Sequence, residues 1–262
     1  MTSHESIESD TITGVAAESV KRPRRILGPL FFVILAIAVI LSGTLAYEAI
    51  RNRELQGAPG YLRVTGIPAD VPTSTANLMA LSPVPHSLAP NFTLVDQHGK
   101  TMSLKSFRGR TVVLEFMDPH CIDICPIVSQ EFVDAYHDLG TDASHVVFVA
   151  VNVNQYFTSV VDIKNFSDEH RLSNIPSWHF LTGPPSVLKT VWRTYNITVE
   201  APNPKADIIH SSIVYFIGPN GRKRYIGVPM DYHTAKGTSY LPANQLASWG
   251  QGIALVAQSL IH

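Results

Sequence analysis

Cys121 and Cys125 are the two cysteines of this 262-residue chain, and three residues separate them. So few cysteines exclude a scaffold held by several disulfides and a zinc site with four cysteine ligands. Two soft thiolates favour Cu(I) or zinc over hard cations, and two thiols can also form one reversible disulfide. The pair is therefore compatible with metal binding, with thiol–disulfide exchange or with a plain structural disulfide.

The position of the pair indicates a junction between a strand and a helix. The cysteines follow the apolar run 111–117 and precede the helix-like stretch 126–139. If the helix begins near Cys121, both thiols lie on one helix face with Cα atoms about 6 Å apart, which permits a disulfide or a shared metal ion. The helix dipole should lower the pKa of at least one thiol. The three-residue spacer distinguishes the motif from that of thioredoxin, which has two.

A three-coordinate site of two cysteines and one histidine suits copper, whereas a structural zinc ion would recruit two histidines. His120 adjoins Cys121 but should point away from it at the end of an extended strand. His210 begins the apolar run 211–218, and in a thioredoxin-like sheet the start of that strand lies opposite the cysteine helix. We therefore expect His210 to face the pair. The other nine of the eleven histidines are expected to be solvated or structural: His4, His86, His98, His137, His145, His170, His179, His233 and His262.

The elements that would position these residues follow residue 90. Short β-branched or aromatic runs cover 92–97, 111–117, 145–153, 177–183, 211–218 and 224–228, and helix-like stretches cover 126–139, 159–170, 184–195 and 242–261. Apolar strands that alternate with helices predict one α/β domain over 90–262, with a central sheet covered by helices on both faces. A net charge of -1 and a hydrophobic content of 45% argue against a nucleic-acid binder and against a disordered chain.

An uncharged segment, residues 26–47, would span about 33 Å as a helix and could cross about 30 Å of hydrocarbon. Basic residues stand directly before it: Lys21, Arg22, Arg24 and Arg25. This asymmetry predicts a single-pass helix in the cell membrane, with a disordered cytoplasmic tail over 1–25 and residues 48–262 on the extracytoplasmic side. The alternative is a cleaved signal peptide, but the segment is long for one and no A-x-A site follows. Outside a reducing cytosol, a lone cysteine pair oxidises by default unless a metal or a reductant intervenes.

Residues 48–89 are predicted to be a Pro-rich tether. Five prolines lie among Gly, Ser and Thr, and no period of 2 or 3.6 is sustained. A flexible coil of this length reaches roughly 35 Å, so the domain could search a shell just above the membrane.

Five features occur in order over about residues 88–260: the run 92–99, the strand 111–117, the motif Cys121-x-x-x-Cys125-Pro126, the block 178–183, and His210 followed by 211–221. Together they resemble the Sco/SenC family of membrane-anchored, thioredoxin-fold copper proteins. In that family two cysteines and a histidine bind Cu(I) or Cu(II), and the protein helps to metallate the CuA centre of cytochrome c oxidase as chaperone, thiol reductant or both. The resemblance implies Cys121, Cys125 and His210 as copper ligands. It also implies a partner: the oxidase subunit that carries the CuA site, or another copper client.

The sequence departs from the family pattern at two places. The family usually reads C-P-D-x-C-P, whereas Ile122, Asp123 and Ile124 separate the cysteines here. The Asp that commonly precedes the histidine is Ile209, which removes one partner for the imidazole.

Two functions stay open. The first is a copper chaperone that holds one copper ion through Cys121, Cys125 and His210. The second is a thiol–disulfide reductase, in which Cys121 attacks a client disulfide and Cys125 resolves the mixed disulfide. A histidine across the site is needed by the first and not by the second. A peroxidase is disfavoured because no P-x-x-x-T-x-x-C pattern precedes Cys121, and an interaction domain with one stapling disulfide is the plainest alternative.

Overall fold

A computed structural model describes residues 64–261 and, before them, residues 32, 34–35, 37–38 and 42–44. The chain divides into two units, Met1–Arg53 and Glu54–His262. Among the residues described in either unit, no helix is both long enough and apolar enough to cross a membrane. The predicted tail 1–25 and most of the predicted transmembrane segment 26–47 lie outside the described residues, so the anchor stays a prediction.

The second unit is built on a sheet of eight strands. In spatial order they are β1 (Ser82–Pro83), β10 (Lys223–Gly227), β9 (Val214–Ile217), β4 (Thr111–Met117), β5 (Val146–Asn152), β6 (Trp178–Thr182), β2 (Thr93–Asp96) and β3 (Thr101–Ser103). The strands β4, β5 and β6 run parallel in the middle, and all other neighbours are antiparallel. Every residue of β4 and β5 is buried, as expected for parallel strands covered on both faces.

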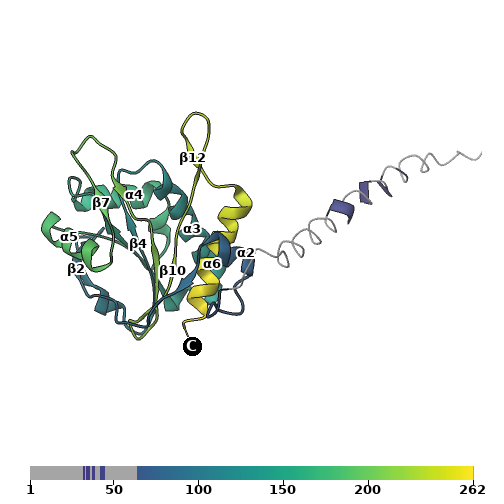
Figure 1. Cartoon of the computed structure of the whole chain (residues 1–262), viewed down its shortest axis with the longest axis horizontal. Coiled ribbons are helices and arrows are strands. Elements are labelled where there is room, and N and C mark those ends of the chain that lie inside the picture. The colour runs from purple at the N-terminus through teal and green to yellow at the C-terminus, as the bar shows by residue number, and fades with distance from the viewer. Residues whose placement is uncertain (1–31, 33, 36, 39–41, 45–63, 262) are drawn as a thin grey trace, which may run out of the picture. The chain divides into compact units, whose positions relative to one another are not determined.

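Helices cover the two faces of this sheet, and Figure 1 shows α5 and α6 on opposite sides of it. The helices are α2 (Thr73–Leu78), α3 (Ile124–Leu139), α4 (Val160–Glu169), α5 (Pro185–Thr194) and α6 (Ala243–Gln258). In β4, Val113 faces the core formed with α2, α3, α4 and α6, whereas Leu114 faces the core formed with α5. Successive side chains of a strand point to opposite faces, so one apolar strand contributes to both cores. The predicted α/β architecture is confirmed.

Each of the six predicted runs overlaps a strand, and each of the four helix-like stretches overlaps a helix. The start of α4 is fixed by Ser159, whose hydroxyl accepts the N–H of Asp162 and whose own N–H donates to the Asp162 carboxylate. Helix α3 begins at Ile124, two residues before the predicted stretch 126–139, and Cys121 lies in the turn before it. The condition that would place both thiols on one helix face is therefore not met. The reason is Asp118, whose side chain accepts the N–H of His120 and stabilises a turn there.

The segment predicted as a tether differs from expectation over its described part. Val71, Met79 and Leu81 are buried in the core that contains α3 and α6. Strand β1 pairs with β10, so residues 71–83 belong to the domain. Their apolar residues are irregularly spaced, and therefore no period marked them in the sequence. The part of the segment before residue 64 lies outside the described residues and stays a predicted tether.

Two short hairpins extend beyond the sheet, and the labels β7 and β12 mark them in Figure 1. One joins β7 (Val199–Glu200) to β8 (Ile209–His210), and the other joins β11 (Tyr232–His233) to β12 (Ser239–Tyr240). The sequence predicted neither. Both hairpins approach the turn that carries Cys121.

Candidate metal centre

The two thiols meet where β4 ends and α3 begins. The backbone N–H of Cys125 donates to Cys121 Sγ at 3.4 Å, and the N–H of Cys121 donates to the Asp118 carbonyl at 3.2 Å. Both cysteines are free thiols. Cys121 is partly exposed and Cys125 is 2% exposed, so one sulfur faces the surface and the other faces the core.

The two thiols differ in acidity. The Cys125 thiol donates a hydrogen bond to Cys121 Sγ, and this bond, with the N–H groups of Cys125 and Asp123, holds the pKa of Cys121 below its ordinary value. The pKa of Cys125 is raised well above its ordinary value, because its thiol proton is engaged by Cys121 and because the group is buried. Cys121 is therefore the more acidic thiol of the pair, and Cys125 is the less acidic one.

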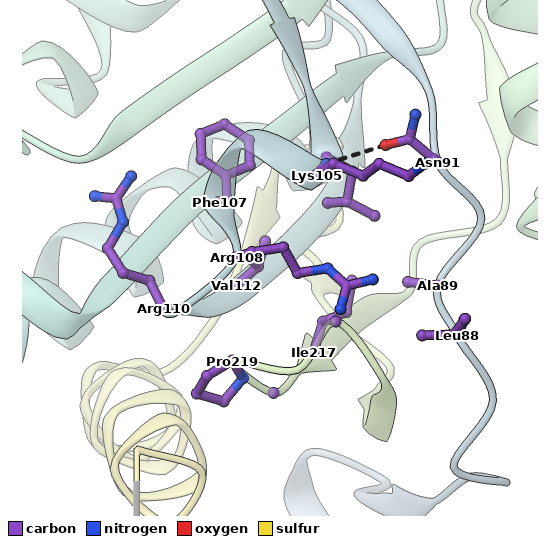
Figure 2. A pocket seen from close by; sticks show the side chains of 13 residues that line it. Leu88, Ala89, Asn91, Lys105, Phe107, Arg108, Arg110, Val112, Ile217 and Pro219 are labelled. Carbon is purple, nitrogen blue, oxygen red and sulfur yellow. Dashed lines mark hydrogen bonds between the residues drawn. The ribbon is translucent and has the colours of Figure 1, made fainter.

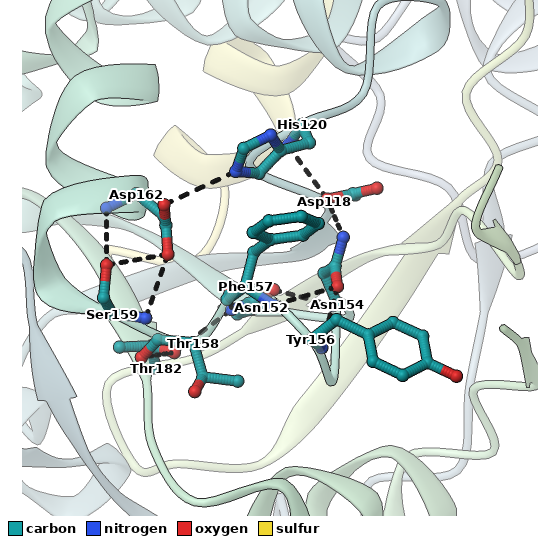
Figure 3. Close-up of polar contacts among 10 residues, drawn as sticks. All are labelled: Asp118, His120, Asn152, Asn154, Tyr156, Phe157, Thr158, Ser159, Asp162 and Thr182. Carbon is teal, nitrogen blue, oxygen red and sulfur yellow. Dashed lines mark hydrogen bonds and ion pairs between the residues drawn. The ribbon is translucent and has the colours of Figure 1, made fainter. Parts of the chain in front are cut away.

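A polar network supports the turn before the cysteines (Figure 3). The buried carboxylate of Asp118 accepts the N–H of His120 and the side-chain amide of Asn154, both at 2.9 Å. Asn154 follows β5, and its amide oxygen accepts the N–H groups of Tyr156 and Phe157. The loop after β5 therefore fixes the loop after β4. This support was not predicted, although polar residues placed directly after two buried strands are a signal that could have found it.

The side chain of His120 is directed away from the cysteines, as predicted. Its Nε2 lies 3.4 Å from Asp162 Oδ1, and its ring stacks on Phe157 with centroids 4.0 Å apart (Figure 3). His120 therefore joins the cysteine turn to the start of α4 and is not a ligand candidate.

The imidazole of His210 is half-buried on β8. Its Nδ1 lies 3.1 Å from the Ser211 carbonyl oxygen, and since a carbonyl only accepts, Nδ1 carries the proton. This tautomer leaves the lone pair on Nε2. Desolvation lowers the pKa of His210, against smaller opposing effects of that hydrogen bond and of Asp118. His210 is thus held as a neutral imidazole, which is the form that binds metals.

Within the part of the chain that the structure describes, no three His, Cys, Asp or Glu side chains lie close enough together to hold a metal ion. The structure brings Cys121 and Cys125 together, but it does not bring His210 into the same coordination sphere. The role of His210 as a third ligand therefore stays a prediction.

Two cavities flank the cysteine turn. One, of about 260 Å³, lies between Asp118, Cys121 and Phe157 on one side and residues 204–208 of the β7–β8 hairpin on the other. The second, of about 460 Å³, runs from Cys121 and Pro126 along α4. The second hairpin also reaches this turn, because Ser239 Oγ lies 3.5 Å from Asp123 Oδ1. The hairpin that carries His210 therefore faces the cysteine turn across a space large enough for movement or for a ligand.

A third cavity, of about 210 Å³, lies beside the start of β4, at the end of that strand far from the cysteines (Figure 2). Its lining includes Phe107, Arg108, Val112 and Ile217 but no cysteine, histidine or carboxylate. It has no donor set for a soft metal and is not part of the candidate centre.

Comparisons with known proteins agree with this arrangement. A family model described as SCO1/SenC matches residues 82–235, a range that contains both cysteines and His210. The SCO1 protein homolog of Bacillus subtilis is 27% identical over 160 residues, which are 60% of this chain and 79% of that protein. The mitochondrial SCO2 homolog of Bos taurus is 27% identical over 140 residues, which are half of each chain.

Two solved structures, of Bradyrhizobium japonicum ScoI and Arabidopsis thaliana ScoI, are both described as having copper bound. Each is 21% identical, with a TM-score of 0.51, and the match covers 66% of this chain and 99% of the solved chain. At this identity the likeness shows the fold, and it confirms the predicted thioredoxin-like sheet with flanking helices.

Proposed function

The chain belongs to the SCO1/SenC family, and we propose that it is a membrane-tethered copper chaperone for the CuA site of cytochrome c oxidase. It binds one copper ion through Cys121, Cys125 and His210 and passes it to the oxidase subunit or to another copper client. The observation that carries this proposal is the pair of free, adjacent thiols beside a cavity that residues 204–208 of the β7–β8 hairpin also line. The same hairpin carries His210, a neutral imidazole with an open Nε2. The copper-bound ScoI structures support the choice of metal.

The donor set suits copper rather than a structural zinc ion. Two thiolates and one imidazole form a soft three-coordinate site, which favours Cu(I). A closed zinc site would need a fourth protein ligand. An incomplete sphere also suits a carrier, because a client ligand can enter it and displace the donors one at a time.

His210 joins the site by movement of the β7–β8 hairpin. This hairpin is a two-residue ladder separate from the main sheet, so its displacement breaks few hydrogen bonds. Copper bound to Cys121 and Cys125 draws His210 across the cavity of about 260 Å³, and release of the histidine opens the site again.

Exposed apolar side chains mark where a client approaches. Ile122, which is 88% exposed, stands beside Cys121, and Ile209, which is 66% exposed, stands beside His210. These are the two positions at which the sequence departs from the usual family pattern. A client that contacts both isoleucines comes into contact with both halves of the copper site.

The second candidate function is thiol–disulfide reduction, and the unequal acidity of the two thiols favours it. The Cys121 thiolate attacks a client disulfide, forms a mixed disulfide and releases one client thiolate. Cys125 then loses its proton and attacks Cys121 Sγ, which releases the second client sulfur and leaves a Cys121–Cys125 disulfide. Each cycle transfers two electrons to the client and needs an external thiol reductant to restore the pair.

Replacement of His210 distinguishes the two functions. Copper-loaded wild type and His210→Ala are each mixed with a metal-free CuA domain, and the copper transferred is measured by metal analysis after separation. In parallel, both proteins are tested for reduction of the oxidised cysteine pair of that domain. We expect His210→Ala to lose copper transfer and to retain disulfide reduction. Equal transfer by the two proteins would contradict the chaperone proposal with His210 as a ligand.

The proposed location of the protein is the membrane, which the described residues leave untested. Residues 26–47 form a single membrane-spanning helix, residues 1–25 remain in the cytoplasm, and the domain lies on the extracytoplasmic side. The support is the uncharged length of the segment and the basic residues that precede it.

A further inference from the structure

A buried carboxyl group links β4, the strand that leads to the cysteines, with residues 211–213, the segment that directly follows His210. Glu115 lies in the middle of β4 and is 1% exposed. Its Oε1 accepts the hydroxyl of Ser212 at 3.2 Å, and the backbone N–H of Ile213 also donates to the carboxyl group. Cys121 stands in the turn after the same strand.

The backbone ladder between β4 and β9 does not reach this segment. It runs from the pair Val112–Ile217 to the pair Leu114–Tyr215 and ends there. Between the end of this ladder and His210, the hydrogen bonds of the Glu115 side chain connect β4 to Ser212 and Ile213. The carboxyl group therefore extends the contact between the two segments past the last backbone pair.

A second anchor holds the same segment from the other side. The N–H of Ser211 donates to the Thr198 carbonyl at 3.0 Å, and the N–H of Thr198 donates to Ser211 Oγ at 3.2 Å. Thr198 precedes β7, so this anchor belongs to the outer hairpin. The residues directly after His210 are thus held twice: Ser211 connects them to the hairpin, and Ser212 and Ile213 connect them through Glu115 to the strand of the cysteines.

We propose that Glu115 is a positioning residue: it holds the base of the hairpin that carries His210 on β4, so that the hairpin moves about this anchor when His210 joins Cys121 and Cys125. The inference rests on the proposed copper site. Glu115 acts on the metal through Ser212 and Ile213, and it is not itself a ligand. A leucine could fill this position without burying a carboxyl group, so the chemical contribution of Glu115 is its hold on the segment after His210.

Glu131 provides a matched control. It lies on α3, it is 0% exposed, and neither of its carboxyl oxygens has a hydrogen-bond partner among the described residues. Glu131 is near enough to Glu115 for the two charges to interact, but its removal breaks no hydrogen bond to the segment after His210.

The test is a double-mutant cycle on copper affinity, measured with the full-length chain in detergent. Glu115→Leu should weaken Cu(I) binding about tenfold, as expected when the support of a metal ligand is lost. Glu115→Gln keeps an acceptor oxygen and should bind copper like wild type, as should Glu131→Leu. In the His210→Ala background, Glu115→Leu should cause no further loss. The Cu(II) absorption spectrum of Glu115→Leu should shift towards that of His210→Ala.

The outcomes separate the inference from the function on which it rests. If His210→Ala binds copper like wild type, the proposed ligand set is wrong and the inference falls with it. If His210→Ala is weakened but Glu115→Leu is not, only the positioning role is overturned. An equal loss from Glu115→Leu with and without His210 would also overturn it. If Glu115→Leu does not fold, Ser212→Ala removes the same hydrogen bond from the other side, and wild-type affinity in that variant would overturn the inference.

Discussion

Cys121 and Cys125 are close in sequence but lie in unlike surroundings. Cys121 is partly exposed and accepts hydrogen bonds, whereas Cys125 is buried and donates its proton. A copper ion needs both sulfurs as thiolates, so metal binding must release the proton of Cys125. The binding of copper by this pair should therefore become tighter as the pH rises.

The unequal acidity predicts unequal alkylation. At neutral pH, iodoacetamide should modify Cys121 first, because its lowered pKa supplies thiolate and its sulfur is accessible. Cys125 should react slowly until the protein is unfolded, because it is buried and its pKa is raised. Peptide mass spectrometry after short exposures measures both rates. Equal rates in the folded, reduced protein would contradict this description.

The titration of Glu115 predicts a pH dependence of stability. Burial raises the pKa of Glu115 from 4.5 to about 8, so the folded state binds the proton more tightly than the unfolded state. The free energy of unfolding must then fall as the pH rises through this window, by up to about 1.4 kcal/mol per pH unit. Glu115→Gln removes the titration, so its stability relative to wild type should increase between pH 5 and pH 8. Urea unfolding of both proteins at the two pH values measures this, and a constant difference would contradict it.

At the scale of single residues, the sequence was sufficient for the cysteine pair and for the direction of His120. It was not sufficient for Asp118 and Glu115, because their partners come from distant segments. Asn154 lies 36 residues after Asp118, and Ser212 lies 97 residues after Glu115. Such contacts depend on how the strands are ordered in the sheet, which residue types alone do not specify.

At the scale of elements, the long apolar strands and the amphipathic helices were predictable, because their patterns are sustained over several residues. Strands β7, β8, β11 and β12 have two residues each and show no period. Helix α3 begins at Ile124, after a turn that Asp118 holds, so Cys121 stands before the helix. The hairpin that carries His210 is thus the part of the site that the sequence described least well.

The contact between α3 and α6 predicts a destabilising substitution. A Cβ on Gly250 would lie 2.6 Å from Asp134 Cβ and 3.3 Å from the backbone nitrogen of Ala135. Alanine favours a helix over glycine by about 1 kcal/mol, but overpacking against backbone costs about 1–3 kcal/mol. Gly250→Ala should therefore lower the free energy of unfolding by about 1 kcal/mol, measured by urea denaturation. Gln251→Ala, on the exposed face of α6, is the control, and an equally stable Gly250→Ala would contradict the tight contact.

At the scale of the whole molecule, a predicted tether connects the folded copper domain to a predicted membrane anchor. The domain includes residues 71–83, which pack on α6 and β10, so the predicted tether is shorter than the composition indicated. A shorter tether restricts the domain to clients closer to the membrane surface.

The anchor predicts how the protein partitions. The full-length chain should stay with membranes after washing with alkaline carbonate, because an uncharged segment of this length is stable in hydrocarbon. A chain that carries two arginines at positions 35 and 38, in place of Leu35 and Ala38, should be released. Immunoblots of the pellet and the supernatant measure the distribution, and release of the unmodified chain would contradict the anchor.

Anaerobic titration of Cu(I) into the reduced full-length chain, in competition with a chromophoric chelator, tests the copper site most directly. We expect one Cu(I) per chain, no competitive binding in Cys121→Ser or Cys125→Ser, and weaker binding in His210→Ala. Failure of the reduced wild-type chain to compete for Cu(I) would contradict the account, and an unchanged affinity in His210→Ala would contradict the assignment of the third ligand.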